Sequence, residues 1–315
     1  MAPLRGPKAS RARRCSIVQR FLACLLVLSV SLSEISASAE NGAAERGLGP
    51  ALQPLVRIDH VPLAVRNLAR ATHTYQRLGF TIKPGRFHPD GIHNAHVKFA
   101  NGAGIELITA EAPKDDLARH YRALLAQGEG PAFVGFYTPN LTALEQRLDG
   151  SGIRYSRDGN LLLFSDPALA WAFIFDVPNL APNDKPEYFR HPNTANATLG
   201  IWIASADEAR MLKLFKTLGA RVEPRRVYVP DVVIANVATV ADAGEIIFLP
   251  AARQILPGRP IVGIVLQTKD LDALDRRIRS AGIMVASTRE TKTYRSTFIA
   301  PRDTHGIWLE FRELR

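Results

Sequence analysis

Cysteine is almost absent from this chain of 315 residues, since Cys15 and Cys24 are the only two and both lie near the N-terminus. If the segment that holds them is removed, the mature chain has none. That excludes structural disulfides, a thiol nucleophile and thiolate metal sites together. A chain without cysteine also suits an oxidising compartment.

The sequence lacks the short motifs of several large protein classes. It contains no G-x-G-x-x-G, P-loop, G-x-S-x-G, H-E-x-x-H or zinc-ribbon spacing, so we expect no nucleotide cofactor and no serine hydrolysis. It also has no basic stripe interleaved with aromatic residues. The formal net charge is +10, but residues 1–39, with six basic residues and one acidic residue, supply half of it. We therefore expect no nucleic-acid partner.

The apolar run near the N-terminus is too short to span a bilayer as an ordinary helix. This run, FLACLLVLSVSL, has about 12 residues and follows a basic stretch that ends at Arg20. The segment ISASAE comes next and contains an A-x-A cleavage pattern at residues 37–39. We expect residues 1–39 to be a cleaved signal peptide and 40–54 a flexible tether. The protein would then be exported, periplasmic or secreted, with no stable membrane span after cleavage.

The remaining chain contains one pattern that recurs four times: an apolar strand, a polar turn, an amphipathic helix and a glycine. The copies begin at residues 58, 132, 198 and 261. In each copy, a polar residue suited to a helix N-cap follows a fixed strand position by seven residues, and a helix-ending glycine follows it by 19. The strand positions are His60, Phe133, Gly200 and Gly263; the caps are Asn67, Asn140, Asp207 and Asp270; the glycines are Gly79, Gly152, Gly219 and Gly282.

Strand-like segments with period-two alternation follow each of these glycines, so each copy is a βαβββ module of 60–70 residues. One module leaves a sheet face uncovered, and two side by side bury it. We therefore predict an α+β fold of four modules in two domains, at residues 55–177 and 197–315. The Pro-rich residues 178–196 form the linker. The sequence leaves open whether the modules pair as first with second and third with fourth, or as first with fourth and second with third.

The paired modules, the I-D-H-V opening strand and the G-I-E-L-I closing strand resemble the vicinal oxygen chelate superfamily. This superfamily includes glyoxalase I, fosfomycin and bleomycin resistance proteins, and extradiol dioxygenases. More narrowly, GIHNAHVKF (91–99) and HPNTA (191–195) resemble its glyoxalase-like domain group. The resemblance implies two glyoxalase-like domains in which paired modules form a cup.

The resemblance also implies a metal at the base of the cup, held by residues on the first strand and the last strand of the modules. His60 and Glu106 match these positions, and imidazole with carboxylate suits one divalent ion: Zn, Mn, Fe or Ni. Glu310 lies two residues beyond the strict match, Trp308, and joins them if the first and fourth modules pair. The alternative is a hydrogen-bonded cluster of His60 and Glu106 without metal.

The other copies depart from the ligand pattern. The position of His60 is held by Phe133, Gly200 and Gly263, and alignment through the glycines places Glu245 on the opposite face of its strand. With the first pairing, the first domain has two ligands and the second has one, whereas a closed site needs three or more.

Five polar residues are candidates for substrate binding. Strand parity allows Asn94 with His96, or His93 alone, to face the cup, while DGIHN is also good turn chemistry. His191 and Asn193 cap the entry to the third module or, by the resemblance, reach the pocket.

We expect the protein to act on or bind a small molecule, and two functions are consistent with these residues. One is a metal-dependent lyase, isomerase or dioxygenase of glyoxalase type acting on a small oxygenated molecule. The other is a metal-free binding or sequestering protein with a degenerate metal site.

Overall fold

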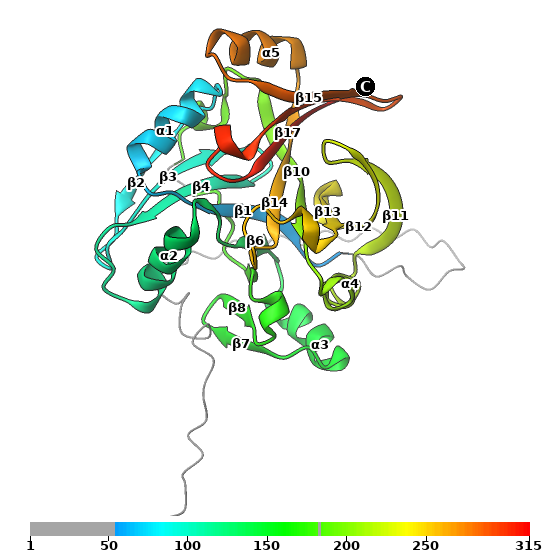
Figure 1. Cartoon of the computed structure of the whole chain (residues 1–315). Helices are drawn as coiled ribbons and strands as arrows, with labels where there is room; N and C mark the ends of the chain where they lie inside the picture. The colour runs from blue at the N-terminus through cyan, green and yellow to red at the C-terminus, as the bar shows by residue number, and fades with distance from the viewer. Residues whose placement is uncertain (1–53, 182–183) are drawn as a thin grey trace, which may run out of the picture.

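The computed structural model describes residues 54–181 and 184–315 (Figure 1). The expected signal peptide and nearly all of the expected tether lie outside the described residues. Among those that are described, no helix combines the length and the hydropathy needed to cross a membrane.

The predicted α+β fold of four βαβββ modules is confirmed. The first comprises β1 (Arg57–Ala64), α1 (Leu68–Arg77), β2 (Lys83–Phe87), β3 (Ile92–Lys98) and β4 (Gly104–Ala110). The second comprises β6 (Val134–Tyr137), α3 (Leu141–Ser151), β7 (Tyr155–Asp158), β8 (Leu161–Phe164) and β9 (Ala172–Phe175). The third comprises β10 (Ala195–Ala204), α4 (Glu208–Thr217), β11 (Arg221–Tyr228), β12 (Val232–Thr239) and β13 (Glu245–Leu249). The fourth comprises β14 (Ile261–Thr268), α5 (Leu271–Ser280), β15 (Val285–Glu290), β16 (Tyr294–Ile299) and β17 (Trp308–Leu314).

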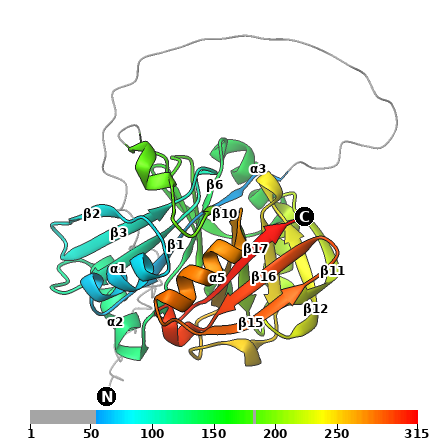
Figure 2. The same cartoon turned by 90° about the horizontal axis from the view of Figure 1, so that it is seen from above.

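The strand order shows which modules pair. The first sheet runs β2-β3-β4-β1-β6-β9-β8-β7, and the second runs β11-β12-β13-β10-β14-β17-β16-β15. In each module the first strand lies parallel to the last, and the sheets are completed by the antiparallel pairs β1–β6 and β10–β14. The first module therefore shares a sheet with the second, and the third with the fourth. Both sheets are curled (Figures 1 and 2).

The predicted helix boundaries rest on caps and glycines that the structure contains. The side chains of Asn67, Asn140 and Asp270 accept hydrogen bonds from backbone amides of the first helical turn, at 2.7–2.9 Å. Asp207 precedes α4 as predicted, but its side chain makes no capping hydrogen bond. The four helix-ending glycines all have positive φ, between 66° and 87°, a conformation that disfavours any residue with a Cβ atom.

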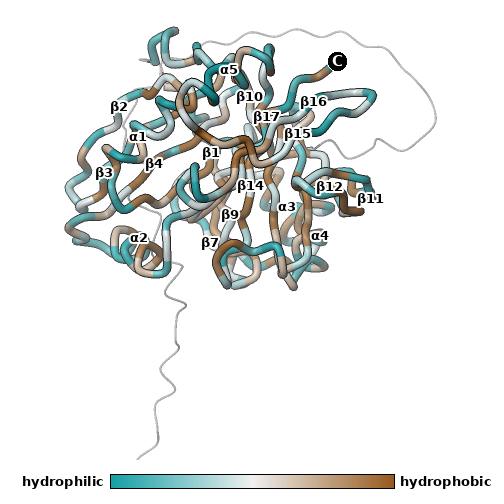
Figure 3. The backbone as a smooth tube through the Cα atoms, turned by 45° about the horizontal axis from the view of Figure 1, so that its top comes forward, coloured by the Kyte–Doolittle hydropathy of each residue, from teal (hydrophilic) through white to brown (hydrophobic). Residues whose placement is uncertain are grey.

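A hydrophobic core lies between the two sheets and is shared by them. Helices α1, α3, α4 and α5 and one face of each sheet contribute buried residues to it. Phe80 stacks on Phe311 with ring centroids 5.8 Å apart, and Phe136 lies edge-on to Phe215 at 5.6 Å, so both contacts join the two halves of the chain. Hydrophobic segments correspondingly gather at the centre of the molecule (Figure 3).

The face of each sheet that is turned away from this shared core forms a cup. The first cup is partly filled by α2 (Asp116–Gln127), an element between the first two modules that the sequence analysis did not anticipate; β5 (Gly130–Pro131) follows it. Four α2 residues pack against strand residues of this face: Leu117, Ala118, Tyr121 and Leu125. The second cup is lined by a separate cluster that includes Trp202, Val237 and Phe298.

Candidate functional site

His60 lies on β1, on the strand face that lines the first cup. An irregularity in the β1–β6 pairing falls between Ile58 and His60. It lets the neighbouring Asp59 turn back, so that Asp59 Oδ1 lies 2.8 Å from His60 Nδ1. Because a carboxylate only accepts, Nδ1 carries the proton of this bond. The imidazole rests on Gly135 of β6, where an added Cβ would lie 3.0 Å from ring atoms.

Glu106 on β4 lies beside the other edge of this imidazole. Its Oε1 accepts a hydrogen bond of 2.7 Å from Asn94 Nδ2, and its Oε2 lies 3.7 Å from His60 Nε2. Asn94 is fixed in turn, because its Oδ1 accepts from the backbone N–H of Arg86 at 3.0 Å. The side chain of Glu106 is only 5 % exposed, so the carboxylate is buried with these partners.

The two cup histidines have opposite pKa shifts. Burial lowers the pKa of His60, but the hydrogen bond and charge of Asp59, with the charge of Glu106, outweigh burial and raise it. Burial lowers the pKa of His96, which faces the same cup opposite Glu106 in the β3–β4 ladder. As the pH rises, His96 therefore releases its proton before His60 does.

The half of the cup that comes from the second module is aromatic. Phe173 and Phe175 on β9 lie edge-on to the His60 ring, with centroids 5.6 and 5.8 Å away, and Phe133 lies edge-on to Phe173. Tyr121 of α2 adds a buried hydroxyl that has no hydrogen-bond partner in the described part of the chain. Burial, together with the negative charge of Glu106, raises the pKa of Tyr121. Helical periodicity in residues 116–127 was the sequence signal that could have revealed this residue.

The chain that follows the second module closes one edge of the cup. Lys98 on β3 bonds to the side chain of Asp184 and to the carbonyl of Asn179, and Lys83 pairs with the same carboxylate. Burial acts to raise the pKa of Asp184, but the hydrogen bonds from these two lysines outweigh burial and hold that pKa below its usual range. The predicted linker therefore contributes contacts to the site, because Asn179 N–H also donates to Asp59 Oδ2 at 3.1 Å.

The structure separates the five predicted binding residues into two groups. Asn94 and His96 face the first cup, while His93 points to the other side of β3 and lies edge-on to Phe87 at 4.8 Å. His191 and Asn193 lie outside the cup, against the shared core. His191 Nδ1 accepts from Thr81 N–H, and its Nε2 donates to the carbonyl of Lys98, both at 3.0 Å.

Asn193 is similarly committed to backbone groups. Its Nδ2 donates to the carbonyl of Leu78 at 2.9 Å and its Oδ1 accepts from Ala195 N–H at 3.1 Å. Both residues of HPNTA therefore anchor the entry to the third module, and the alternative in which they reach the pocket does not hold.

Glu310 lies on β17 in the second cup and does not meet His60 and Glu106. It accepts from Ser296 Oγ at 2.7 Å and from Arg312 Nε at 2.8 Å. Sheet register nevertheless makes Glu310 the counterpart of Glu106. His60 pairs with Gly104, two residues before Glu106, and Gly263 pairs with Trp308, two residues before Glu310.

Glu245 also differs from its sequence-based placement. It pairs with Gly200 across β10 and β13, and its Oε2 lies 3.5 Å from Arg312 Nη1. Glu245 therefore faces the second cup together with Glu310, and its expected location on the opposite face was wrong. Alignment through the glycines failed because the paired positions of the first and last strands are 44 residues apart in the first module but 45 apart in the third and fourth.

The donor set of the first cup falls short of a metal site. His60 and Glu106 supply two donors, and His96 of the same cup is not grouped with them closely enough to add a third. The matching positions of the second module hold Phe133 and Phe173, which have none. Within residues 54–181 and 184–315, no three His, Cys, Asp or Glu side chains are grouped to hold a metal ion. Because a closed site needs at least three protein ligands, these residues do not fit a resident metal.

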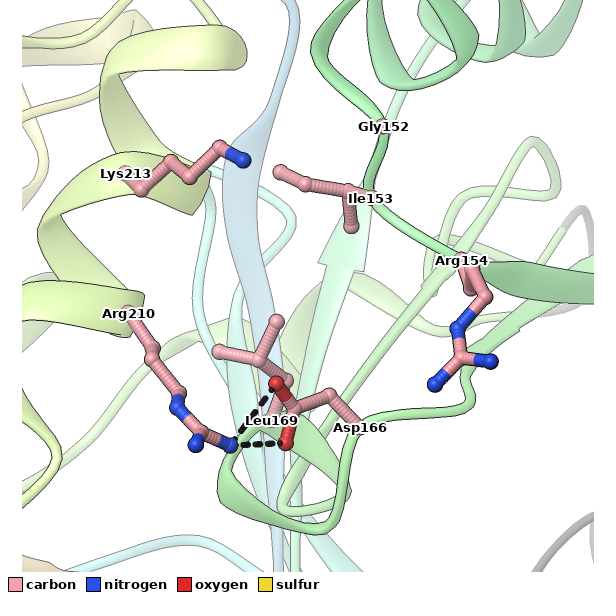
Figure 4. Close-up of a pocket in the computed structure, with 7 residues that line it drawn as sticks. All are labelled: Gly152, Ile153, Arg154, Asp166, Leu169, Arg210 and Lys213. Atoms are coloured by element: carbon pink, nitrogen blue, oxygen red, sulfur yellow. Dashed lines mark hydrogen bonds and ion pairs between the residues drawn. The ribbon is translucent and has the colours of Figure 1, made fainter.

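A separate cavity of about 260 Å³ lies between the end of α3 and α4 (Figure 4). Arg210 of α4 reaches across it and binds Asp166 with both contacts near 3 Å, at 2.9 and 3.1 Å. None of the sequence-predicted site residues lines it. The lining residues are Gly152, Ile153, Arg154, Asp166, Leu169, Arg210 and Lys213.

Two curled sheets, each built from paired βαβββ modules, with His60 and Glu106 on the first and last strands of one module, define a protein of the vicinal oxygen chelate superfamily. The sequence profile of the family described as "Glyoxalase-like domain" matches residues 58–219, and the chain belongs to this family. A search of functionally curated proteins found no similar sequence.

Solved structures with this fold include three dioxygenase-related chains. A xylose isomerase-like TIM barrel/4-hydroxyphenylpyruvate dioxygenase fusion protein aligns over 84% of this chain and 50% of its own, with 11% identity and a TM-score of 0.62. Our chain thus spans about half the length of that protein. A catechol 2,3-dioxygenase aligns over 81% and 87%, with 14% identity and a TM-score of 0.53. A variant of homoprotocatechuate 2,3-dioxygenase from B. fuscum aligns over 84% and 73%, with 12% identity and a TM-score of 0.57. At these identities the likeness shows the fold alone.

Proposed function

We propose that this protein binds a small oxygenated organic molecule in the first cup through His60 and Glu106, without a resident metal. The observation that carries the proposal is the 3.7 Å separation between His60 Nε2 and Glu106 Oε2. That separation is too long for a direct hydrogen bond. One oxygen atom placed between them lies within hydrogen-bonding distance of both.

The partners of the pair decide which groups remain for a ligand. Asp59 occupies His60 Nδ1 and Asn94 occupies Glu106 Oε1, so Nε2 and Oε2 are left facing each other. A protonated His60 donates from Nε2 to a ligand oxygen, and Glu106 accepts a hydroxyl proton at Oε2. A hydroxyl group satisfies both at once, and its proton can pass to the carboxylate as negative charge on the oxygen is stabilised by the imidazolium.

The aromatic half of the cup suits the hydrocarbon part of such a ligand. Phe133, Phe173 and Phe175 offer apolar ring surface beside the polar pair. Catechol combines an aromatic ring with two adjacent hydroxyl groups, and the name of one structural neighbour contains it. We therefore choose catechol as the first probe.

Calorimetric titration of catechol into EDTA-treated protein tests the proposal. We expect wild-type protein to bind, and Glu106→Gln to weaken binding roughly 10- to 100-fold, because a hydrogen bond to a charged group is lost. His93→Gln is the matched control, since His93 is on the neighbouring strand but faces away from the cup. Equal affinities of wild type and Glu106→Gln, or loss of binding in His93→Gln, would contradict the assignment.

The competing function is a metal-dependent enzyme of glyoxalase or dioxygenase type. One feature favours it. Histidines that bind a metal through one ring nitrogen commonly donate from the other to a carboxylate, as His60 Nδ1 does to Asp59. The missing third and fourth protein donors count against it. Catechol binding that requires an added divalent ion in the same titration would support the enzyme over the metal-free binding protein.

A further inference from the structure

Four charged side chains form a continuous chain across the second cup, in the sheet that the proposed function does not use. Arg225 Nη1 donates to Glu245 Oε1 at 2.7 Å, and Glu245 Oε2 lies 3.5 Å from Arg312 Nη1. Arg312 Nε in turn donates to Glu310 Oε1 at 2.8 Å. Beyond Arg225, Glu223 Oε1 lies 3.7 Å from Arg225 Nε, which is too long for a hydrogen bond, and Glu223 Oε2 accepts from Arg221 Nη2 at 2.7 Å. Positive and negative charges therefore alternate along the whole cluster, which has no net charge.

This chain leads from the surface into the interior. The side chain of Arg225 is 33 % exposed, that of Glu245 is 20 %, that of Arg312 is 10 % and that of Glu310 is 0 %. Register places all four on the cup face, since Arg225 pairs with Ala235, and Glu310 pairs with Phe298, both members of the second-cup cluster.

Both ends of the chain carry polar atoms that lack a hydrogen-bond partner among the described residues. Glu310 Oε2 is one, and Nε and Nη2 of Arg225 are the others. A fully buried carboxylate oxygen without a donor destabilises the fold, and a donor supplied by a ligand removes that cost. The inner end therefore presents an unused acceptor, and the outer end presents unused donors.

The surrounding residues organise the cup around this chain. Tyr294 of β16 lies beneath the Arg312 guanidinium, which sits 4.5 Å from the ring centroid. Arg289 Nε donates to the carbonyl of Pro230 at 3.1 Å, so the outer strand β15 is linked to the turn between β11 and β12. These contacts link the two edges of the curled sheet, with Arg225 on the edge strand β11 and Glu310 on β17, third from the other edge.

We propose that the second cup is a binding site for a small carboxylate that also bears a hydroxyl or amino group. Its carboxylate binds the free N–H groups of Arg225, and its hydroxyl or ammonium group donates to Glu310 Oε2. The ligand thereby satisfies both ends of the charged chain. A monofunctional carboxylate leaves Glu310 unsatisfied and binds more weakly.

Titration of the full chain with glycolate, glycine and acetate by calorimetry tests this site. We expect glycolate or glycine to bind at least about tenfold more tightly than acetate, and the two arms to show whether hydroxyl or ammonium is the preferred donor. Arg225→Gln should weaken that binding at least about tenfold. Arg226→Gln is the matched control, because Arg226 is the next residue on β11 and is exposed on the other face.

Glu310→Gln supplies the second arm, in which glycolate or glycine should lose its advantage over acetate. Circular dichroism and catechol binding in the first cup show that each variant is folded, so failure here is distinct from failure of the proposed function. The site is rejected if neither glycolate nor glycine binds, if acetate binds as tightly, or if Arg226→Gln weakens binding as much as Arg225→Gln.

Discussion

At the scale of single residues, Asp59 controls the protonation of His60. The raised pKa of His60 means that protonation favours the folded state. The resulting stabilisation is complete below the ordinary value of 6.5 and is lost as the pH rises through the folded-state pKa. For Asp59→Asn we therefore predict a lower pKa of His60. The loss in unfolding free energy relative to wild type should be largest below pH 6.5 and should shrink above it. Urea unfolding of wild type and Asp59→Asn, below and above pH 6.5, measures this loss. A difference in unfolding free energy that does not change with pH would contradict the assignment.

Gly135 makes room for the imidazole. An added Cβ would lie 2.9 Å from Phe173 Cζ and 3.0 Å from His60 ring atoms. We predict that Gly135→Ala lowers the unfolding free energy by about 1–3 kcal/mol, because crowding displaces one of the two rings, and that it also weakens catechol binding. Gly150→Ala is the control, since no atom beyond its chain neighbours and the nearby backbone of α3 lies within 4 Å of the position an added Cβ would take. It should leave stability unchanged or raise it by up to about 1 kcal/mol. A Gly135→Ala variant as stable as Gly150→Ala would show that the packing is looser than described.

Several site residues could be predicted from the sequence, because strand alternation places His60, Glu106, Asn94 and His96 on one face. The role of Asp59 could not be predicted, since simple alternation puts Asp59 on the opposite face from His60. Only the irregular strand pairing brings the Asp59 carboxylate to the His60 imidazole. Local patterns likewise do not show which strand residues face each other across a ladder. For that reason the sequence alignment matched Glu106 to Trp308, two residues before its true counterpart Glu310.

At the scale of secondary structure, α2 depends on a residue from the other half of the chain. Arg259, which is 6 % exposed, donates to the carbonyls of Gly128, Gly130 and Pro131, just beyond the C-terminus of α2. Burial lowers the pKa of Arg259 to about 10, so the guanidinium is still charged at neutral pH and complements the helix C-terminus.

We predict that Arg259→Gln destabilises α2 by about 2–3 kcal/mol, because several charge-assisted hydrogen bonds are lost. Hydrogen–deuterium exchange should therefore rise in residues 116–127 while α3, which does not contact Arg259, serves as the internal control. Equal increases in both helices would point to global destabilisation rather than to a specific cap. The sequence did not reveal α2, since it lies outside the repeated pattern and its apolar residues fill a cup rather than the shared core.

At the scale of the whole molecule, one core joins both sheets. Phe215 of α4 contacts Phe136 and Trp171 of the first half and Phe248 of the second. We predict that Phe215→Ala lowers the unfolding free energy by about 3–5 kcal/mol and that both halves still unfold in one transition. Calorimetry with exchange measurements on each half tests this. Val232→Ala, at a position that is 47 % exposed, should change stability by no more than about 0.5 kcal/mol. Two separate transitions would show that the halves are independent.

The modular fold could be predicted from spacing alone, since strand, cap and glycine recur at fixed intervals and each has a local physical cause. The sequence could not predict which modules share a sheet, because that depends on the strand pairs β1–β6 and β10–β14. The pairing decides the function of the site: it gives His60 and Glu106 the aromatic Phe133 and Phe173 as neighbours, and it places Glu310 in the other cup.

The metal content of the purified protein tests the central claim most directly. Elemental analysis should be made on wild type and on His60→Ala, isolated without chelator. We predict no stoichiometric divalent metal in either protein, because no three His, Cys, Asp or Glu side chains of the described residues are grouped to hold one. One equivalent of metal in wild type that disappears in His60→Ala would contradict it and would identify a metal-dependent site.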